Sequence, residues 1–224
     1  MHLIIALDFN NESTAFTLVD QLDPSQCALK VGSEMFTLLG APFVRALITR
    51  GFKVFLDLKF HDIPNTVARA SMAAADLGVW MLTVHASGGL KMMQAARDAI
   101  EPYGDRRPLV VAVTVLTSMS EAELSTLGIQ APLQSHVGLL AGLAHEARLD
   151  GIVCSALDTM QIKRLFGERF LAVTPGIRQP GDAMGDQSRI VTPAFALNAG
   201  SDYLVVGRSI TSAAHPMTAL RDFL

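Results

Sequence analysis

Cysteine, runs of like charge and long apolar runs are all scarce in this sequence, and each scarcity argues against a class of protein. Only Cys27 and Cys154 are present, each within an apolar stretch, which favours buried free thiols in a reducing cytoplasm over a disulfide framework. The 18 basic and 21 acidic residues form no run of one sign, so we expect no nucleic acid and no membrane as partner. The apolar run at 3–7 is too short for a signal peptide or a membrane span. We therefore expect a cytoplasmic protein that binds a small molecule.

Short apolar runs recur along the whole chain and predict buried strands. They are continuous rather than alternating, as strands covered on both faces by helices are. Eight such runs lie at 3–9, 28–32, 53–60, 80–86, 108–116, 151–156, 170–176 and 203–209. Segments with helical spacing of apolar residues lie between them, such as 12–22, 42–49, 66–77, 90–100, 134–148 and 160–166. The wide interval from Leu116 to Gly151 also predicts an extra short helix around SMSEAEL.

Eight repeats of strand and helix fit two α/β architectures. One is a doubly wound open sheet, and the other is a closed (β/α)8 TIM barrel. The regular spacing and the length of 224 residues favour the barrel, formed as a single domain over residues 1–224.

Polar residues gather where the predicted strands end, which is the active-site face of such a barrel. Polar side chains on buried strands are costly unless they are paired or used, so this concentration indicates a site. The alternative is that two or three of them only close the barrel mouth. The residues are Asp8, Lys30, Asp57, Lys59, His85, Thr114, Thr117, Ser155, Thr174, Arg178 and Arg208.

The segment VFLDLKFHDIPNT at 54–66 holds the densest charge. Asp57 and Lys59 are two apart on an extended strand, so their side chains leave the same face and can touch. Asp62 follows just past the strand, before a helix that we expect to begin near Asn65 after Pro64. An ion-pair network that closes the barrel is the alternative for a bare Asp-x-Lys pair. The third charge favours a site, in which a lysine flanked by carboxylates stays cationic and acts as a general acid.

The stretch DLKFHDIPNT at 57–66, followed by a helix rich in small residues, resembles the signature of the orotidine 5′-monophosphate decarboxylase family. A bare Asp-x-Lys-x-x-Asp is less specific, because related barrel decarboxylases that act on keto-sugar phosphates also carry it. The resemblance extends along the chain through ALDF, LKVG, TVLTS, TPGIR, GDQ and VVGRSIT. It implies decarboxylation of orotidine 5′-monophosphate to UMP, the last step of de novo pyrimidine nucleotide synthesis, without a cofactor or a metal.

The loops after the seventh and eighth strands predict a phosphate site. Such loops bind phosphate in many barrels, and here they contain Arg178, Gln187, Gly207 and Arg208. The alternative is an ordinary surface loop with a helix cap. The resemblance assigns Gly207, Arg208 and Gln187 to direct contact with the 5′-phosphate, with Arg178 close by, and implies that the glycine-rich loop is a lid.

The resemblance also assigns roles around the rest of the substrate. It implies that Asp8 and Lys30 bind ribose hydroxyls and that Thr117 and Ser118 meet the pyrimidine edge. Asp57, Lys59 and Asp62 are the implied catalytic residues, with Lys59 as proton donor. It further implies a two-fold homodimer with shared active sites, in which Asp62, Ile63 and Thr66 reach into the partner's site.

Two other functions compete with this prediction. A metal-dependent sugar-phosphate epimerase or keto-acid decarboxylase would use His61, His85, Asp8 and Asp57 as ligands, but Lys59 would then place a cation among them. A non-catalytic phosphate-binding barrel is the second alternative, and the intact set of three charges argues against it. The sequence leaves open whether His85 or Ser155 touches substrate.

Overall fold

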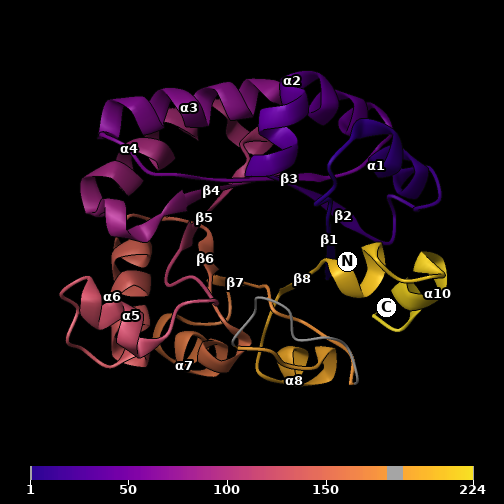
Figure 1. Ribbon diagram of the computed structural model, residues 1–224. Helices are drawn as coiled ribbons and strands as arrows, with labels where there is room; N and C mark the ends of the chain where they lie inside the picture. Colours follow the sequence, from indigo (N-terminus) through magenta and orange to yellow (C-terminus); the bar gives the residue numbers. More distant parts are fainter. Residues whose placement is uncertain (1, 181–188, 224) are drawn as a thin grey trace.

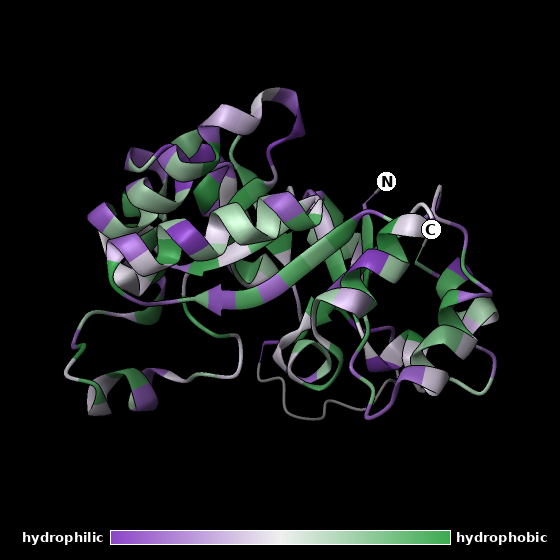
Figure 2. Ribbon diagram, turned by 90° about the horizontal axis from the view of Figure 1, so that it is seen from above, coloured by the Kyte–Doolittle hydropathy of each residue, from purple (hydrophilic) through white to green (hydrophobic). Residues whose placement is uncertain are grey.

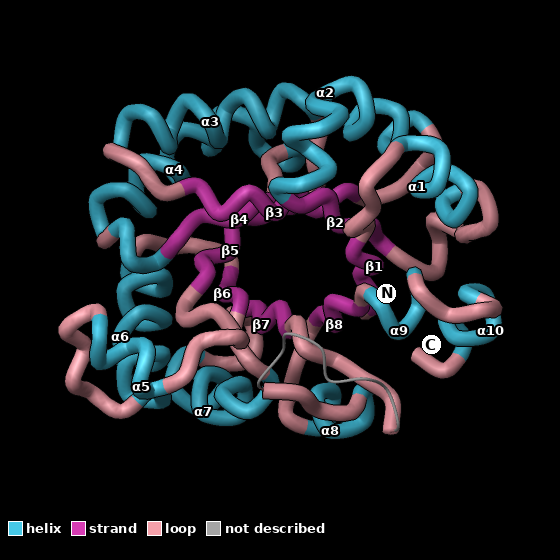
Figure 3. The backbone as a smooth tube through the Cα atoms, in the orientation of Figure 1, coloured by secondary structure: helices cyan, strands magenta, loops and turns pink. Residues whose placement is uncertain are grey.

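Eight parallel strands close into a ring, each paired with the next in chain order and β8 paired with β1 (Figure 3). The computed structural model describes residues 2–180 and 189–223. The closed barrel confirms the predicted (β/α)8 fold over the open sheet. The strands are β1 (Leu3–Ala6), β2 (Ala28–Gly32), β3 (Val54–Phe60), β4 (Met81–His85), β5 (Leu109–Val113), β6 (Gly151–Val153), β7 (Leu171–Thr174) and β8 (Tyr203–Val206).

Helices surround this ring on its outside (Figure 1). The short helix α5 has a capping box, in which Ser120 and Glu123 each bind the other's backbone N–H, and it confirms the extra helix predicted there. The α-helices are α1 (Glu12–Val19), α2 (Ser33–Thr49), α3 (Pro64–Leu77), α4 (Leu90–Ile100), α5 (Glu121–Thr126), α6 (Leu133–Glu146), α7 (Ala156–Phe166), α8 (Pro193–Asn198), α9 (Arg208–Thr211) and α10 (Pro216–Arg221). Two 3-10 helices, η1 (Ala86–Gly88) and η2 (Glu101–Arg106), flank α4.

The core has two layers because each strand is buried on both faces. The outer layer lies between the strands and the helices. The inner layer fills the barrel, with Ile4, Phe55, Met81, Val111 and Val173 at its centre. The helices carry both hydrophobic and hydrophilic residues along their length, as expected for a ring of helices with one covered face (Figure 2).

The second helical segment differs from its prediction. The apolar spacing indicated 42–49 alone, whereas α2 begins at Ser33 and contains a break at Gly40, whose φ is 62°. A left-handed glycine followed by Pro42 interrupts the helical hydrogen bonds and resets the apolar spacing, so only the second half was recognised. The helical segments named from apolar spacing do not include the short helices α8, α9 and α10, although eight strand–helix repeats imply a helix after β8.

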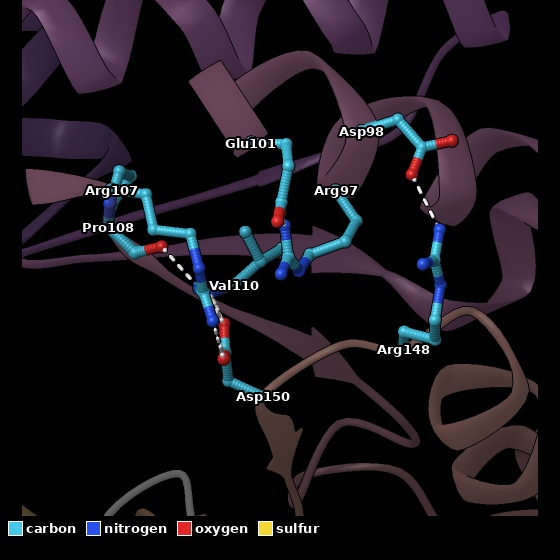
Figure 4. A network of polar contacts seen from close by, with 8 residues as sticks. All are labelled: Arg97, Asp98, Glu101, Arg107, Pro108, Val110, Arg148 and Asp150. Carbon is cyan, nitrogen blue, oxygen red and sulfur yellow. Dashed lines mark hydrogen bonds and ion pairs between the residues drawn. The ribbon is translucent and has the colours of Figure 1, made fainter. Parts of the chain in front are cut away.

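The amino ends of the strands are joined by ion pairs that also bind backbone. Arg107 donates to both carboxylate oxygens of Asp150, at 2.8 and 2.7 Å, and the Asp150 carboxylate also accepts the backbone N–H of Val110 (Figure 4). Hydrogen bonding to Asp150 raises the pKa of Arg107. Asp202, just before β8, accepts the N–H of Ala172 in the same way. This end of the barrel is therefore held by carboxylates placed just before β6 and β8.

Candidate active site

A cavity of about 550 Å³ opens at the carboxyl ends of the strands. It is lined by side chains from β1, β2, β3, β5, β6 and β8 and by residues that follow β1, β2, β5, β7 and β8. Nine of the residues that the sequence proposed for the site lie in its wall: Asp8, Lys30, Asp57, Lys59, Thr117, Ser118, Arg178, Gly207 and Arg208. Gln187 lies outside the described residues.

Four of these side chains form a row of alternating charge. Lys59 Nζ lies 2.9 Å from Asp57 Oδ2, and Lys30 Nζ lies 3.6 Å from the same oxygen. Lys30 Nζ also lies 3.4 Å from Asp8 Oδ1. Gly32 makes room for this ammonium, since a Cβ at that position would lie 3.1 Å from Lys30 Nζ. Asp57 is thus placed between two lysines, an arrangement that the sequence interpretation missed when it grouped Asp57 and Lys59 with Asp62 alone.

Asp57 and Lys59 touch, but not because β3 is regular. Leu56 pairs with Leu82 of β4, and the next pair is Phe60 with Val84. Between these two pairs, β3 advances by four residues while β4 advances by only two, so the register shifts. Lys59 itself has φ 53°, in the left-handed region that non-glycine residues rarely occupy. The expectation of an extended strand through Lys59 was therefore wrong, and an irregular strand end brings the two side chains together.

The Thr83 hydroxyl on β4 contacts both of these residues. It accepts the backbone N–H of Lys59 at 2.8 Å and donates to Asp57 Oδ1 at 3.1 Å. Thr83 is 0% exposed. Sequence reasoning missed this residue because it lies inside an apolar run, and only the contact between strands shows its use.

Asp62, Ile63 and Thr66 lie outside the cavity. Asp62 is exposed and accepts the N–H of Ile63, and Ile63 is 66% exposed. A second hollow, of about 320 Å³, is lined by Asp62 and Thr66 together with Lys59 and His61. Lys59 therefore borders both hollows, with Asp57 in one and Asp62 in the other.

Arg178 and Arg208 lie where the loops after β7 and β8 meet the cavity. Arg178 is 8% exposed, and its guanidinium donates to the carbonyl of Ile177 at 3.0 Å. The base of the β7 loop is closed by backbone bonds, in which the Arg178 N–H donates to Val191 and the Val191 N–H donates to Gly176. Arg189 also donates to both oxygens of buried Asp158, at 2.8 and 2.7 Å. These contacts fix Arg178 at the cavity wall.

Several other polar residues at strand ends have structural partners instead. The hydroxyls of Thr114 and Thr174 donate to the carbonyls of Val153 and Tyr203, and the Ser155 hydroxyl caps α7 by accepting the N–H of Leu157. None of the three lines the cavity. The alternative reading, that some polar residues only close the barrel mouth, is correct for these three.

His85 also lies beside the cavity and not in its wall. Its ring stacks on His61, with 5.3 Å between centroids, and its Nδ1 lies 2.6 Å from the Ser87 hydroxyl. Burial, followed by the nearby His61 and Lys59, lowers the pKa of His85. We therefore expect a neutral imidazole near neutral pH.

The four ligands of the metal-dependent alternative do not form a metal-binding group. Across 2–180 and 189–223, the structure places no three His, Cys, Asp or Glu side chains so that they could hold a metal ion.

Glu34 and Thr211 line the cavity and were not predicted, because neither lies at a strand end. No helix in the described part of the chain is long and apolar enough to cross a bilayer.

Comparison with known proteins gives consistent relatives. The profile of the orotidine 5′-phosphate decarboxylase / HUMPS family matches residues 1–223. An orotidine 5′-phosphate decarboxylase of Legionella pneumophila is 60% identical over 96% of this chain and 93% of its own length. One from Vibrio cholerae is 58% identical over 98% of this chain and 95% of its own length.

Solved structures agree with these relatives. The crystal structure of orotidine 5′-phosphate decarboxylase from Lactobacillus acidophilus superposes with a TM-score of 0.87 at 38% identity, covering 99% of this chain and 98% of that one. An uncharacterized conserved protein from Geobacillus kaustophilus is 40% identical, also with a TM-score of 0.87, over 99% of this chain and all of its own.

Proposed function

Since the chain belongs to the orotidine 5′-phosphate decarboxylase / HUMPS family, we propose that it converts orotidine 5′-monophosphate to UMP, with Lys59 as proton donor. The family description carries two names, whereas the curated relatives at 58–60% identity carry only the first. Because these relatives are named only for the nucleotide, we favour orotidine 5′-monophosphate over a keto-sugar phosphate as the substrate. The observation that carries the mechanism is Asp57 held between Lys59 and Lys30 at the cavity wall, at 2.9 and 3.6 Å.

Loss of CO₂ from C6 of the pyrimidine leaves an electron pair in the ring plane, where the ring π system cannot delocalise it. Stabilisation must then come from charges already in place, which act strongly where water is excluded. Lys59 faces the developing carbanion and transfers a proton from Nζ to C6. Asp57 lies near the substrate carboxylate, so departure of that negative group as neutral CO₂ is favoured, while Lys30 balances the charge of Asp57.

The remaining cavity residues hold the substrate away from the reacting bond. Arg178, Gly207 and Arg208 bind the 5′-phosphate, together with Gln187. Asp8 and Lys30 bind ribose hydroxyls, and Thr117 and Ser118 meet the pyrimidine edge. Binding energy gained at the phosphate contributes to turnover as well as affinity when it closes the site around the ring.

The active form is a homodimer in which Asp62, Ile63 and Thr66 of each chain complete the other chain's site. Support comes from the exposure of Asp62 and Ile63 and from the hollow that Asp62 shares with Lys59. The buried free thiols of Cys27 and Cys154 agree with a reducing compartment such as the cytoplasm.

A spectrophotometric assay tests the reaction. The purified protein should decarboxylate orotidine 5′-monophosphate, and exhaustive chelation should leave the rate unchanged. Keto-sugar phosphates serve as the comparison substrates. Activity on these alone, or activity lost on chelation and restored by magnesium, would favour the metal-dependent alternative.

Subunit exchange tests the shared site. Lys59→Ala and Asp62→Ala should each be nearly inactive, but a mixed dimer holds one doubly altered site and one intact site. Random exchange makes about half of the dimers mixed, so roughly a quarter of wild-type activity should return. If mass spectrometry verifies exchange and no activity returns, Asp62 serves its own chain.

A further inference from the structure

We infer that Thr83 is a positioning residue for the charged row, setting the geometry of Lys59 and Asp57 through one hydroxyl. The inference rests on the proposed roles of these two residues. Thr83 does not line the cavity, so it acts through its neighbours and not on the substrate.

The register of β3 and β4 shows why a side chain is needed at this point. Between the pairs Leu56 with Leu82 and Phe60 with Val84, three residues of β3 face the single residue Thr83. A regular ladder would give the N–H of each alternate residue a backbone carbonyl. Here the N–H of Lys59 is bound by the Thr83 hydroxyl, which takes the place of that carbonyl.

The same hydroxyl has one hydrogen, and it points toward Asp57. It can therefore accept from Lys59 and donate to Asp57 at the same time, which ties the backbone of one residue to the carboxylate of the other. Thr83 is 0% exposed, so water cannot reach the position to replace the hydroxyl.

The tie matters because the Lys59 backbone is strained. A non-glycine residue with φ 53° stays there only while its surroundings hold it. Without the hydroxyl, the segment from Asp57 to Lys59 can relax toward extended backbone, which moves Nζ relative to the cavity. A displacement of about 1 Å at a reacting group can lower a rate by about a hundredfold.

Two substitutions separate the hydroxyl from the shape of the side chain. Thr83→Val keeps the branched shape and removes the hydroxyl, whereas Thr83→Ser keeps the hydroxyl. We expect Thr83→Val to lower kcat roughly ten- to a hundredfold while KM and the Kd for UMP stay within about twofold, because the phosphate contacts are untouched. Thr83→Ser should stay within about threefold of wild type.

Thr114→Val is the matched control. Its hydroxyl is also buried at a strand end, but it donates to the carbonyl of Val153, which the Thr114 N–H also reaches. Its kcat should not change. Amide hydrogen exchange at Lys59 gives a readout of position, and it should accelerate in Thr83→Val alone.

Each result bears on the inference. Full activity in Thr83→Val, or equal loss in Thr83→Val and Thr83→Ser, would overturn it. If Thr83→Val does not fold, Thr83→Ala replaces it, and activity equal to that of Thr83→Ser again overturns the inference. Lys59→Ala distinguishes a failure of the proposed function from a failure of the Thr83 inference. If Lys59→Ala remains active, the proposed function of the charged row is wrong, and so is the role of Thr83 that depends on it. If Lys59→Ala is inactive and Thr83→Val is active, only the Thr83 role is wrong.

Discussion

The two ends of the barrel hold their charged side chains in different ways. At the amino end, Asp150 accepts two bonds from Arg107 and one from the backbone of Val110 (Figure 4). Asp202 accepts the N–H of Ala172 and pairs at 2.7 Å with Lys163, which is 6% exposed and donates to two carbonyls as well. Every charge in these contacts has several short partners within the fold.

At the carboxyl end, the two lysines of the charged row are held less tightly. Lys30 lies 3.4 and 3.6 Å from its two carboxylates, and Lys59 is 36% exposed to the cavity beside a strained backbone. Charges that face an open cavity remain available to a ligand, whereas fully bonded charges do not. The difference indicates that the amino end supplies stability and the carboxyl end supplies chemistry, as in other barrels of this fold.

Of the substitutions at the carboxyl end, Lys59→Ala should cause the largest loss of activity. We expect kcat to fall by at least about a thousandfold, because the substitution removes both the proton donor and the charge that stabilises the carbanion. The melting temperature should not fall, since residues held for function in strained geometry are often not stabilising. Steady-state kinetics, UMP binding and thermal scanning measure these quantities. A variant that keeps a tenth of the activity would remove Lys59 from the proton-donor role.

Asp150→Ala should produce the opposite result at the amino end. It leaves the Arg107 guanidinium and the Val110 N–H without their carboxylate, at a cost of about 3 kcal/mol. For a chain of this size that lowers the melting temperature by roughly 6–12 °C, while kcat of the folded protein stays unchanged. Differential scanning calorimetry and kinetics on the same preparation measure both.

Asp98→Ala is the matched control for this end. Its pair with Arg148 lies in the same region (Figure 4), but the two side chains are 62% and 75% exposed. An exposed pair contributes at most about 0.5 kcal/mol, so the melting temperature should barely move. Equal losses in Asp98→Ala and Asp150→Ala would mean that backbone bonding at Asp150 adds nothing.

The fold could be predicted because a strand that is buried on both faces is recognisable from the residues of its own segment. Each parallel strand is a continuous apolar run, and β3 and β4 are recognisable from their own residues alone. The ends were less predictable: the last residues of several runs, such as Val115 and Leu116, leave the ladder and form the cavity wall. Where a strand ends depends on its neighbours, which the local pattern does not contain.

The site could be predicted only where the residue type itself limits the chemistry. Charged residues at strand ends identified the cavity wall, because a buried charge needs a partner or a use. Hydroxyls could not be sorted in the same way: Thr114 binds a carbonyl, whereas Thr83 binds both Lys59 and Asp57. The irregular register that creates this contact comes from pairing between two strands, and no spacing within β3 records it.

Arg208→Ala should distinguish the residues of the cavity that bind the phosphate from those that take part in the reaction. The substitution removes a charged contact to phosphate, and it should lower kcat/KM for orotidine 5′-monophosphate by about a hundredfold. Phosphate-free orotidine is the control substrate, because it never made the contact and should be processed at an unchanged rate. Equal losses on both substrates would contradict the phosphate assignment of Arg208.

His85 should give the smallest effect, as a dependence of stability on pH. Its pKa is lowered from the ordinary value of 6.5 by burial, with His61 and Lys59 opposing a further positive charge at the carboxyl end. Below pH 6.5 the unfolded chain therefore binds a proton more readily than the folded one, so stability is lost as the pH falls from 6.5 toward the lower folded pKa. Above 6.5 this contribution is fully present. His85→Gln keeps a polar partner for Ser87 and removes the titration, so its melting temperature should fall less than that of wild type on acidification through this range. His215→Gln, at an exposed position, is the control and should follow wild type. If His85→Gln also follows wild type, the folded protein accepts the proton on His85 without a loss of stability, and the proposed pH dependence is wrong.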